Sequence, residues 1–415
     1  MNKPFFYLSL FLTTTLFSVR TFAQENTVNK SNVRTLRIDP SAANGGSMLQ
    51  VFTEISYVPL ETTKESLFGD ITQLEVSEDN YIIYDNDTKC ILIFEKSGKF
   101  KVKIELGKVV EGVRLNSETL DVYGLSLKKT GSDCIIQVYI AGKLYAFDTN
   151  AKRIKETIEE KQKHRASQFY NFNGDTKVVS YYQDSKGKDK SLYQYALIKD
   201  GKTSAKYFEI DTGKYSKSGD LAVGGPSFIE TDSPDILHAV RYYDYNIYRI
   251  DSEGISAAYE LIFPAKNTIP KDFNTNKVYF GKKINHFFKN VENIYGVGYT
   301  FKIGDFLYFK CGSLSSYIRR NGSFVYDLKN DHLISLNRLD PDSLSHHLPI
   351  IGGWDNDFKK FDGKHLYASL SSLELFSYYN QEKKKNYKYP EVMQNYFNKG
   401  NKKDNPVIIK LTPKH

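Results

Sequence analysis

The sequence has little cysteine, and its glycine and proline contents are near or below average; each of these observations excludes a class of protein. Its 415 residues include 27 Gly and 12 Pro, too few for a collagen-like or low-complexity chain. The three cysteines, Cys90, Cys134 and Cys311, are far apart. Their odd number leaves at least one free thiol and excludes a disulfide framework, and their spacing does not match a zinc site. We expect them to act as small buried hydrophobic residues.

Long apolar runs are also scarce, and the one extended run lies at the N-terminus. Residues 5–19 are uncharged and mostly apolar, follow Lys3, and precede the small residues Thr21 and Ala23. This pattern predicts a signal peptide over residues 1–23. The alternative, a membrane anchor, needs a run of about 20 apolar residues. No other run could span a bilayer, so we expect an exported protein.

The sequence also has no large excess of positive or negative charge. The chain has 57 Lys and Arg against 49 Asp and Glu, a net charge of +8. The basic residues are scattered among acidic ones, and the one dense run, residues 383–388, is typical of a solvated loop. We therefore predict that the protein does not bind nucleic acid.

Aromatic residues are abundant, with 31 Tyr and 27 Phe, and short apolar runs recur as hairpins. The clearest hairpin consists of residues 81–99, in which two apolar runs are separated by a polar turn and closed by a glycine turn. The closing turns of five such units are separated by 53, 50, 53 and 77 residues, and lie at Gly98, Ala151, Gly201, Gly254 and Asp331. A period near fifty with hardly any helical periodicity predicts four-stranded blades arranged around an axis.

Six innermost strands can be identified, so the expected fold is an all-β, six-bladed β-propeller of four-stranded antiparallel blades. The candidate inner strands are residues 71–76, 123–127, 169–172, 227–230, 294–299 and 354–358. Residues 55–60 and 406–411 lie outside the repeats, so the last blade is expected to join strands from both ends of the chain, which removes two sheet edges. We predict a flexible segment over residues 24–52 and a single, monomeric propeller domain over 53–415. The insertion 264–292 is expected to contain a short helix.

The chain resembles a known family in three segments. Residues 57–63 (YVPLETT), the first-blade pattern from Tyr84 to Phe100, and residues 405–411 (NPVIIKL) are similar to uncharacterised secreted six-bladed propellers of gut-type bacteria, which have blades like those of NHL repeats. The resemblance implies the fold and export, and with them a location in the periplasm or on the cell surface of a bacterium. It brings no established activity or catalytic residues.

One short motif contains oxygen ligands. Trp354-Asp355-Asn356-Asp357 is expected to open the last inner strand near the channel mouth. Asp355 and Asp357 could bind Ca²⁺, which prefers such ligands, although Asp-Asn-Asp clusters also commonly cap turns. No nucleotide-binding or hydrolase motif is present, and no cofactor is otherwise expected.

Arginine and aromatic residues gather at several predicted connections between strands. They are expected to form a rim at one or both ends of the ring: Arg165, Arg241, Tyr242, Tyr243, Arg319, Arg320 and Trp354. Aromatic faces beside guanidinium groups suit sugars, carboxylated glycans or extended peptides. The alternative is that these tyrosines only pack between blades.

These observations favour a non-enzymatic binding or scaffold protein that recognises a carbohydrate or protein partner on one face. The competing hypothesis is a metal-dependent hydrolase or lyase, like lactonase-type propellers, with its site at the mouth of the central channel. Such a site is assembled from separate blades, and its convergence cannot be read from sequence.

Overall fold

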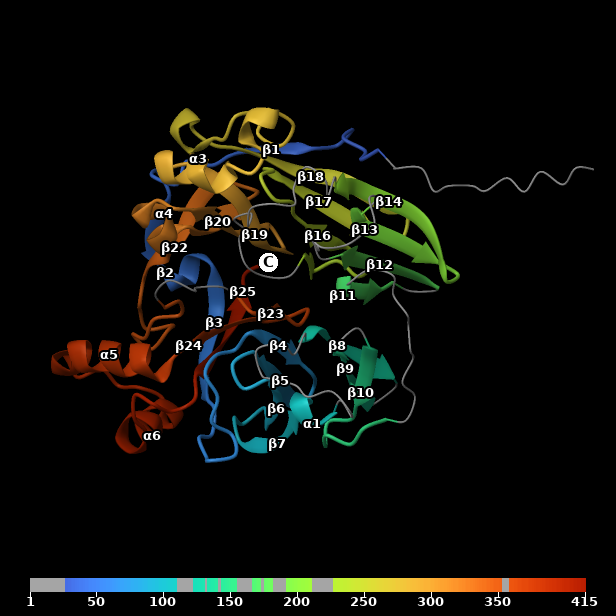
Figure 1. The fold of residues 1–415 in the computed structure, drawn as a ribbon. Helices are drawn as coiled ribbons and strands as arrows, with labels where there is room; N and C mark the ends of the chain where they lie inside the picture. Colours follow the sequence, from blue (N-terminus) through green and yellow to red (C-terminus); the bar gives the residue numbers. More distant parts are fainter. Residues whose placement is uncertain are drawn as a thin grey trace, which may run out of the picture.

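The protein is a ring of six β-sheets in the computed structural model (Figure 1). The structure describes residues 27–109, 122–130, 133–140, 143–154, 166–172, 175–181, 192–210, 227–352 and 358–415. The predicted six-bladed β-propeller is therefore confirmed. The predicted signal peptide, residues 1–23, lies outside the described residues.

Each blade is an antiparallel sheet whose strands follow one another from the axis outward. Blade 1 contains β4 (Gln73–Val76), β5 (Asn80–Asp85), β6 (Cys90–Glu95) and β7 (Phe100–Glu105). Blade 2 contains β8 (Val122–Thr130), β9 (Asp133–Ile140) and β10 (Lys143–Phe147), and an isolated bridge joins Phe147 to Arg153 at its outer edge. Blade 3 contains β11 (Ala166–Asn171), β12 (Thr176–Tyr181), β13 (Leu192–Lys199) and β14 (Lys202–Ile210).

Blades 4 and 5 complete the upper part of the ring in Figure 1. Blade 4 contains β15 (Phe228–Glu230), β16 (Leu237–Ala239), β17 (Asn246–Asp251) and β18 (Gly254–Ile262). Blade 5 contains β19 (Ile294–Ile303), β20 (Phe306–Ser313), β21 (Ser323–Asp327) and β22 (His332–Asp340). Five of the six predicted inner strands coincide with β4, β8, β11, β15 and β19. The sixth prediction falls mostly on residues outside the described part, and the first strand of that blade begins at Lys360.

Blade 6 closes the ring with strands from both ends of the chain, as the sequence predicts. Its order is β23 (Lys360–Phe361), β24 (Leu366–Leu370), β25 (Val407–Pro413) and β3 (Phe52–Pro59). Between Val407 and Leu411, β25 hydrogen-bonds to β24 on one side and to β3 on the other. The two chain ends are thus joined by backbone hydrogen bonds, which leaves no open edge between them.

The five predicted closing turns follow the third strand of blades 1 to 5 and precede the fourth strand or, in blade 2, the bridge at Arg153. Four of them have a residue with left-handed backbone, Gly98, Ala151, Gly201 and Asp331. Blade 6 lacks this turn because its third and fourth strands, β25 and β3, come from opposite ends of the chain. A ring of six blades therefore shows only five repeats in its sequence.

The N-terminal segment adds strands to two blades. β1 (Arg34–Arg37) pairs in parallel with the outer strand β18, and β2 (Asn44–Ser47) pairs in parallel with β22. The sequence analysis, which predicts a flexible segment over residues 24–52, did not anticipate these strands. Their formation satisfies backbone groups at the edges of blades 4 and 5, and their short polar sequences give no period-2 signal.

Apolar side chains fill the spaces between neighbouring blades. One cluster joins blades 1 and 2 through Ile82, Ile93, Ile136 and Val138, and others join blades 3 to 4, 4 to 5, 5 to 6 and 6 to 1. Every residue of β5 is buried. Both faces of a blade are covered, which explains why its strands read as continuous apolar runs.

The helices gather at one end of the ring. Because the strands alternate in direction, the connections from second to third strand and from each blade to the next lie at the same end. We call it the helix end, and the opposite end, with short hairpin turns, the turn end. The helix end carries η3 (Lys277–Tyr279), α3 (Lys283–Lys289), α4 (Ser316–Asn321), α5 (Ser372–Glu382) and α6 (Glu391–Lys399). α3 confirms the helix expected in the insertion 264–292. None of the helices in the described ranges is long and apolar enough to cross a membrane.

Candidate functional site

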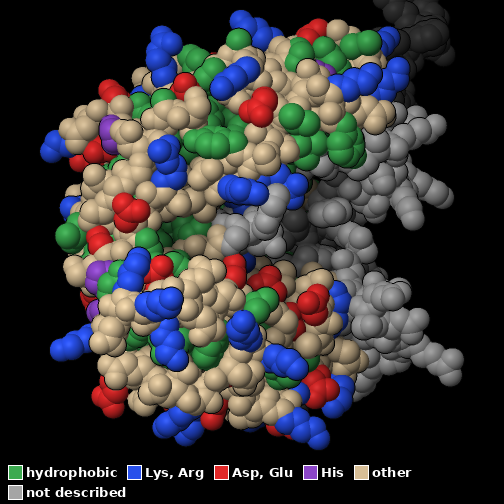
Figure 2. All heavy atoms as spheres, turned by 90° about the vertical axis from the view of Figure 1, so that its left-hand side faces the viewer, with side chains coloured by type: hydrophobic (Ala, Val, Ile, Leu, Met, Phe, Trp, Pro, Cys, Tyr) green, Lys and Arg blue, Asp and Glu red, His purple; other side chains and the backbone are tan. Residues whose placement is uncertain are grey.

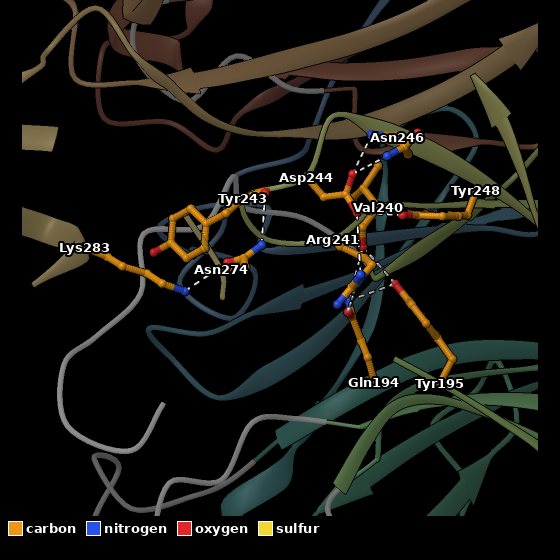
Figure 3. Close-up of polar contacts among 10 residues, drawn as sticks. All are labelled: Gln194, Tyr195, Val240, Arg241, Tyr243, Asp244, Asn246, Tyr248, Asn274 and Lys283. Carbon is orange, nitrogen blue, oxygen red and sulfur yellow. Dashed lines mark hydrogen bonds and ion pairs between the residues drawn. The ribbon is translucent and has the colours of Figure 1, made fainter. Parts of the chain in front are cut away.

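Arg241 is a predicted rim residue that contacts side chains of two blades. It lies in the connection between β16 and β17, at the helix end of blade 4. Its guanidinium carbon is 4.0 Å from the ring centroid of Phe208 on β14. Its Nε donates to Gln194 Oε1 at 3.4 Å, and one terminal nitrogen is 3.6 Å from Asp244 (Figure 3). The arginine therefore bridges blades 3 and 4.

Buried hydroxyl groups hold the surroundings of Arg241 in place. Tyr248 donates to the Asp244 carboxylate at 2.6 Å, and Tyr195 donates to the carbonyl of Val240 at 3.0 Å (Figure 3). Burial raises the pKa of both tyrosines, so these hydroxyls remain protonated donors. The Arg241 side chain stays 30% exposed, and a ligand would meet a cation whose position is already fixed.

The two tyrosines after Arg241 face different ways. Tyr242 is 40% exposed, whereas Tyr243 is only 5% exposed. Tyr243 has a left-handed backbone and stacks on Phe287 of α3, with ring centroids 5.8 Å apart. The sequence predicts Tyr243 on the rim, but the insertion covers it. The Tyr243 ring therefore packs between the loop and the insertion, whereas the Tyr242 ring is exposed.

The insertion 264–292 is attached to this loop by polar contacts. The Asn274 side chain donates to the Tyr243 carbonyl at 3.1 Å and accepts from the Lys283 ammonium at 3.1 Å (Figure 3). The same ammonium lies 4.2 Å from the Tyr243 ring centroid. Lys283 is buried, and its cation–π contact and hydrogen bond compensate part of the cost of burying the charge.

Arg319 and Arg320 are exposed in the last turn of α4, at the helix end of blade 5. The residues before this helix are tied to the end of the insertion, since Ser313 Oγ donates to the Val291 carbonyl at 2.8 Å and Ser315 Oγ donates to Glu292 at 2.9 Å. The loop of Arg241, the insertion and α4 therefore form one continuous surface.

Four predicted site residues cannot be placed. Arg165, Trp354, Asp355 and Asp357 lie outside the described residues, so the proposed Ca²⁺ ligands are not located. Within the ranges that the structure describes, no group of three His, Cys, Asp or Glu side chains is arranged to hold a metal ion.

A polar cluster on the axis was not predicted. Lys360 Nζ on β23 lies 2.9 Å from Glu75 on β4 and 3.2 Å from Glu230 on β15, which connects blades 6, 1 and 4. Burial raises the pKa of Glu75, and Lys360 offsets only part of this effect. Burial opposes the charge of Lys360, but the two carboxylates outweigh it and raise its pKa. No local motif could have revealed three residues from three blades.

The sequence analysis also missed α5 and most exposed apolar residues of the helix end. α5 does carry a recognisable start signal, because Ser371 and Glu374 form a capping box. Ten large apolar side chains are exposed in the described part of the chain. Eight of them lie in helix-end connections: Leu67, Tyr242, Val278, Phe288, Val291, Tyr317, Leu373 and Val392.

Comparison with known proteins supports the fold. A family model described as a domain of unknown function, DUF4934, matches residues 37–412. A structure of a candidate exported protein from Bacteroides fragilis is 14% identical with a TM-score of 0.62, over 92% of this chain and 100% of that one. A DUF4221 member from Bacteroides vulgatus is 12% identical with a TM-score of 0.43, over 88% and 97% of the two chains. No curated protein matches this sequence.

Proposed function

Because this chain belongs to the DUF4934 family of domains of unknown function, we propose its function from the geometry of the helix end. The protein is an exported, non-enzymatic binding propeller that recognises a carbohydrate or protein partner through this end of the ring. A rigid sheet scaffold with side chains displayed on its connections is suited to such a role.

The observation that carries the proposal is the state of Arg241. Its guanidinium is held between Phe208, Gln194 and Asp244, yet 30% of the side chain remains exposed beside the exposed ring of Tyr242. An arginine fixed in this way loses little conformational entropy when it binds a carboxylate or a hydroxyl group. An adjacent aromatic face can stack on a sugar ring or an extended peptide.

Export is supported by two observations. The N-terminal pattern of Lys3, an apolar run and Ala23 is that of a signal peptide, and the similar Bacteroides fragilis structure is of a candidate exported protein. Mass determination of the N-terminus of the protein recovered from its native host tests this part, with cleavage after Ala23 expected. A protein that keeps residues 1–23 and stays in the cytoplasm would contradict it.

The binding proposal is tested with Arg241→Lys and a panel of glycans and peptides. Lysine keeps the charge but lacks the planar fork that fits Phe208 and Gln194, so we expect ligand affinity to fall about tenfold or more, as for a lost charge-assisted hydrogen bond. Lys99→Met, an exposed lysine at the turn end, is the control and should leave affinity unchanged. If the native chain, Arg241→Lys and Lys99→Met bind every ligand with equal affinity, the assignment of the binding site to Arg241 is refuted.

A further inference from the structure

The helix end of blades 4 and 5 concentrates positive charge. Three described segments form it, residues 240–245, 264–292 and 314–322, and together they contain nine Lys and Arg against three Asp and Glu. Seven of the nine basic side chains are exposed: Lys266, Lys271, Lys277, Lys282, Lys289, Arg319 and Arg320. The chain as a whole is only mildly basic, so this end holds most of its excess charge and attracts anions.

Exposed aromatic rings lie in the same three segments, each within three residues of a basic residue. Tyr242 follows Arg241, Phe288 precedes Lys289, and Tyr317 lies three residues before Arg320 on α4, a spacing that puts both on one side of a helix. The exposed fractions of the three rings are 40%, 68% and 39%. In Figure 2, which faces the side where α3 to α6 lie in Figure 1, apolar and basic side chains are interspersed with a few acidic ones over the upper part of the molecule.

The three ring and cation pairs are carried by a surface whose parts are tied together. Asn274 joins the insertion to the Arg241 loop, Ser315 joins α4 to Glu292, and the hydroxyl of Tyr317 donates to the carbonyl of Pro40 at 3.3 Å. A preorganised surface loses less entropy on binding than separate flexible loops would.

We propose that this surface binds an acidic polysaccharide, one whose sugar residues carry carboxylate or sulfate groups. A repeating chain of sugar rings and anions matches a surface on which an aromatic ring and a cation recur three times, because rings stack on sugar faces and cations pair with the acidic groups. A second copy of this chain would bring like charges together and is disfavoured. The inference rests on the proposed binding function and specifies its ligand.

The test measures binding of the mature chain, residues 24–415, to polygalacturonate, chondroitin sulfate, neutral dextran and polyglutamate by calorimetry and affinity electrophoresis. We expect binding to one or both acidic polysaccharides, with affinity falling as salt screens the charges, and none to dextran. Phe288→Ala and Lys289→Met should each weaken binding about threefold to tenfold, as for one stacking or ionic contact. Lys99→Met should not, and thermal unfolding checks that all variants fold.

The other outcomes separate the two proposals. Dextran binding that depends on Arg241 would refute the acidic ligand and leave the proposed function intact. Binding of polyglutamate with no binding of either acidic polysaccharide would also refute it, and would indicate an acidic protein partner at the same end. Polysaccharide binding that is unchanged in Arg241→Lys, Phe288→Ala and Lys289→Met would place the ligand elsewhere and refute both proposals. No binding to any of the four probes would refute the acidic polysaccharide.

Discussion

Lys360 and Glu75 form an ion pair of 2.9 Å between the last blade and the first. These blades are neighbours only because the ring closes, and the same ammonium reaches Glu230 of blade 4 at 3.2 Å. The Lys360 and Glu75 side chains are 21% and 10% exposed. The pair therefore lies in surroundings where an unpaired charge is costly.

We predict that Lys360→Met lowers the free energy of unfolding by on the order of 3 kcal/mol, because it leaves the Glu75 carboxylate buried without its cation. Guanidinium denaturation measures the change. Lys364→Met, which removes an exposed lysine in the adjacent turn, is the control and should stay within about 0.5 kcal/mol of the native chain. The double variant Lys360→Met with Glu75→Gln should recover part of the loss. A single variant as stable as the control would show that the pair does not hold the blades together.

Asp342 should make the stability of the fold depend on pH. Its carboxylate accepts hydrogen bonds from Ser47 Oγ at 2.6 Å, from the Met48 amide at 3.0 Å and from the Leu344 amide at 2.9 Å. Burial opposes the charge, but these donors outweigh it and lower the pKa of Asp342. A carboxyl group whose folded pKa is lowered stabilises the fold above its unfolded pKa of about 3.9, and this stability is lost as pH falls through the folded value.

We therefore expect Asp342→Asn to be less stable than the native chain at pH 7, and the difference to shrink as pH falls below about 4. Melting temperatures measured between pH 2.5 and 7 check this. Asp251→Asn, at a surface hairpin of blade 4 far in sequence from the N-terminal segment, is the comparison variant. If the melting temperatures of Asp342→Asn and the native chain differ by the same amount at every pH, ionisation of Asp342 does not stabilise the fold and the prediction is wrong.

The three cysteines should differ in reactivity. Cys311 is buried, whereas Cys90 and Cys134 are partly exposed. Burial raises the pKa of Cys311 far above that of an exposed thiol and also raises the pKa of Cys90. We expect a thiol reagent at pH 8 to modify Cys311 only after denaturation. Peptide mapping identifies the site, and rapid labelling of Cys311 in the folded protein would contradict its burial between blades 4 and 5.

Substitution by alanine should destabilise the protein by different amounts at two glycines in equivalent turns. Gly98 and Gly201 both have left-handed backbone, with φ of 87° and 71°. A Cβ at Gly201 would meet no atom of the described residues within 4 Å, whereas one at Gly98 would collide with the carbonyl oxygen of Pro59, where β3 ends. Gly201→Ala should cost roughly 1–2 kcal/mol for the left-handed backbone. Gly98→Ala should cost clearly more in chemical denaturation, and equal losses would show that the contact with β3 can relax freely.

The blades can be predicted from the sequence because each hairpin is encoded by residues that are close together in the chain. Each hairpin has two apolar runs and a turn within about twenty residues, and the turns at Gly98 and Asp331 can be read directly. The parallel strands β1 and β2 depend on edges more than 200 residues away, so their own four residues give no signal. The N-terminal segment was therefore expected to be flexible.

The candidate site shows the same division between local and distant information. Arg241 and Tyr242 are recognisable in the sequence as a basic and aromatic cluster in a connection, and the structure places this connection between β16 and β17, at the helix end. The burial of Tyr243 depends on Phe287, which lies more than 40 residues later in an insertion. The meeting of Lys360, Glu75 and Glu230 depends on ring closure, which no local pattern encodes.

The order of strands in the chain has a consequence for synthesis. β1, β2 and β3 are made before any blade, yet their partners β18, β22 and β25 follow much later in the chain. Blades 1 to 3 can form while the chain is still growing, but the first strands to emerge must wait without partners until the last have appeared. A chain interrupted before Val407 would present β3 as an unpaired eight-residue strand, so quality control that recognises open strand edges would detect an incomplete copy.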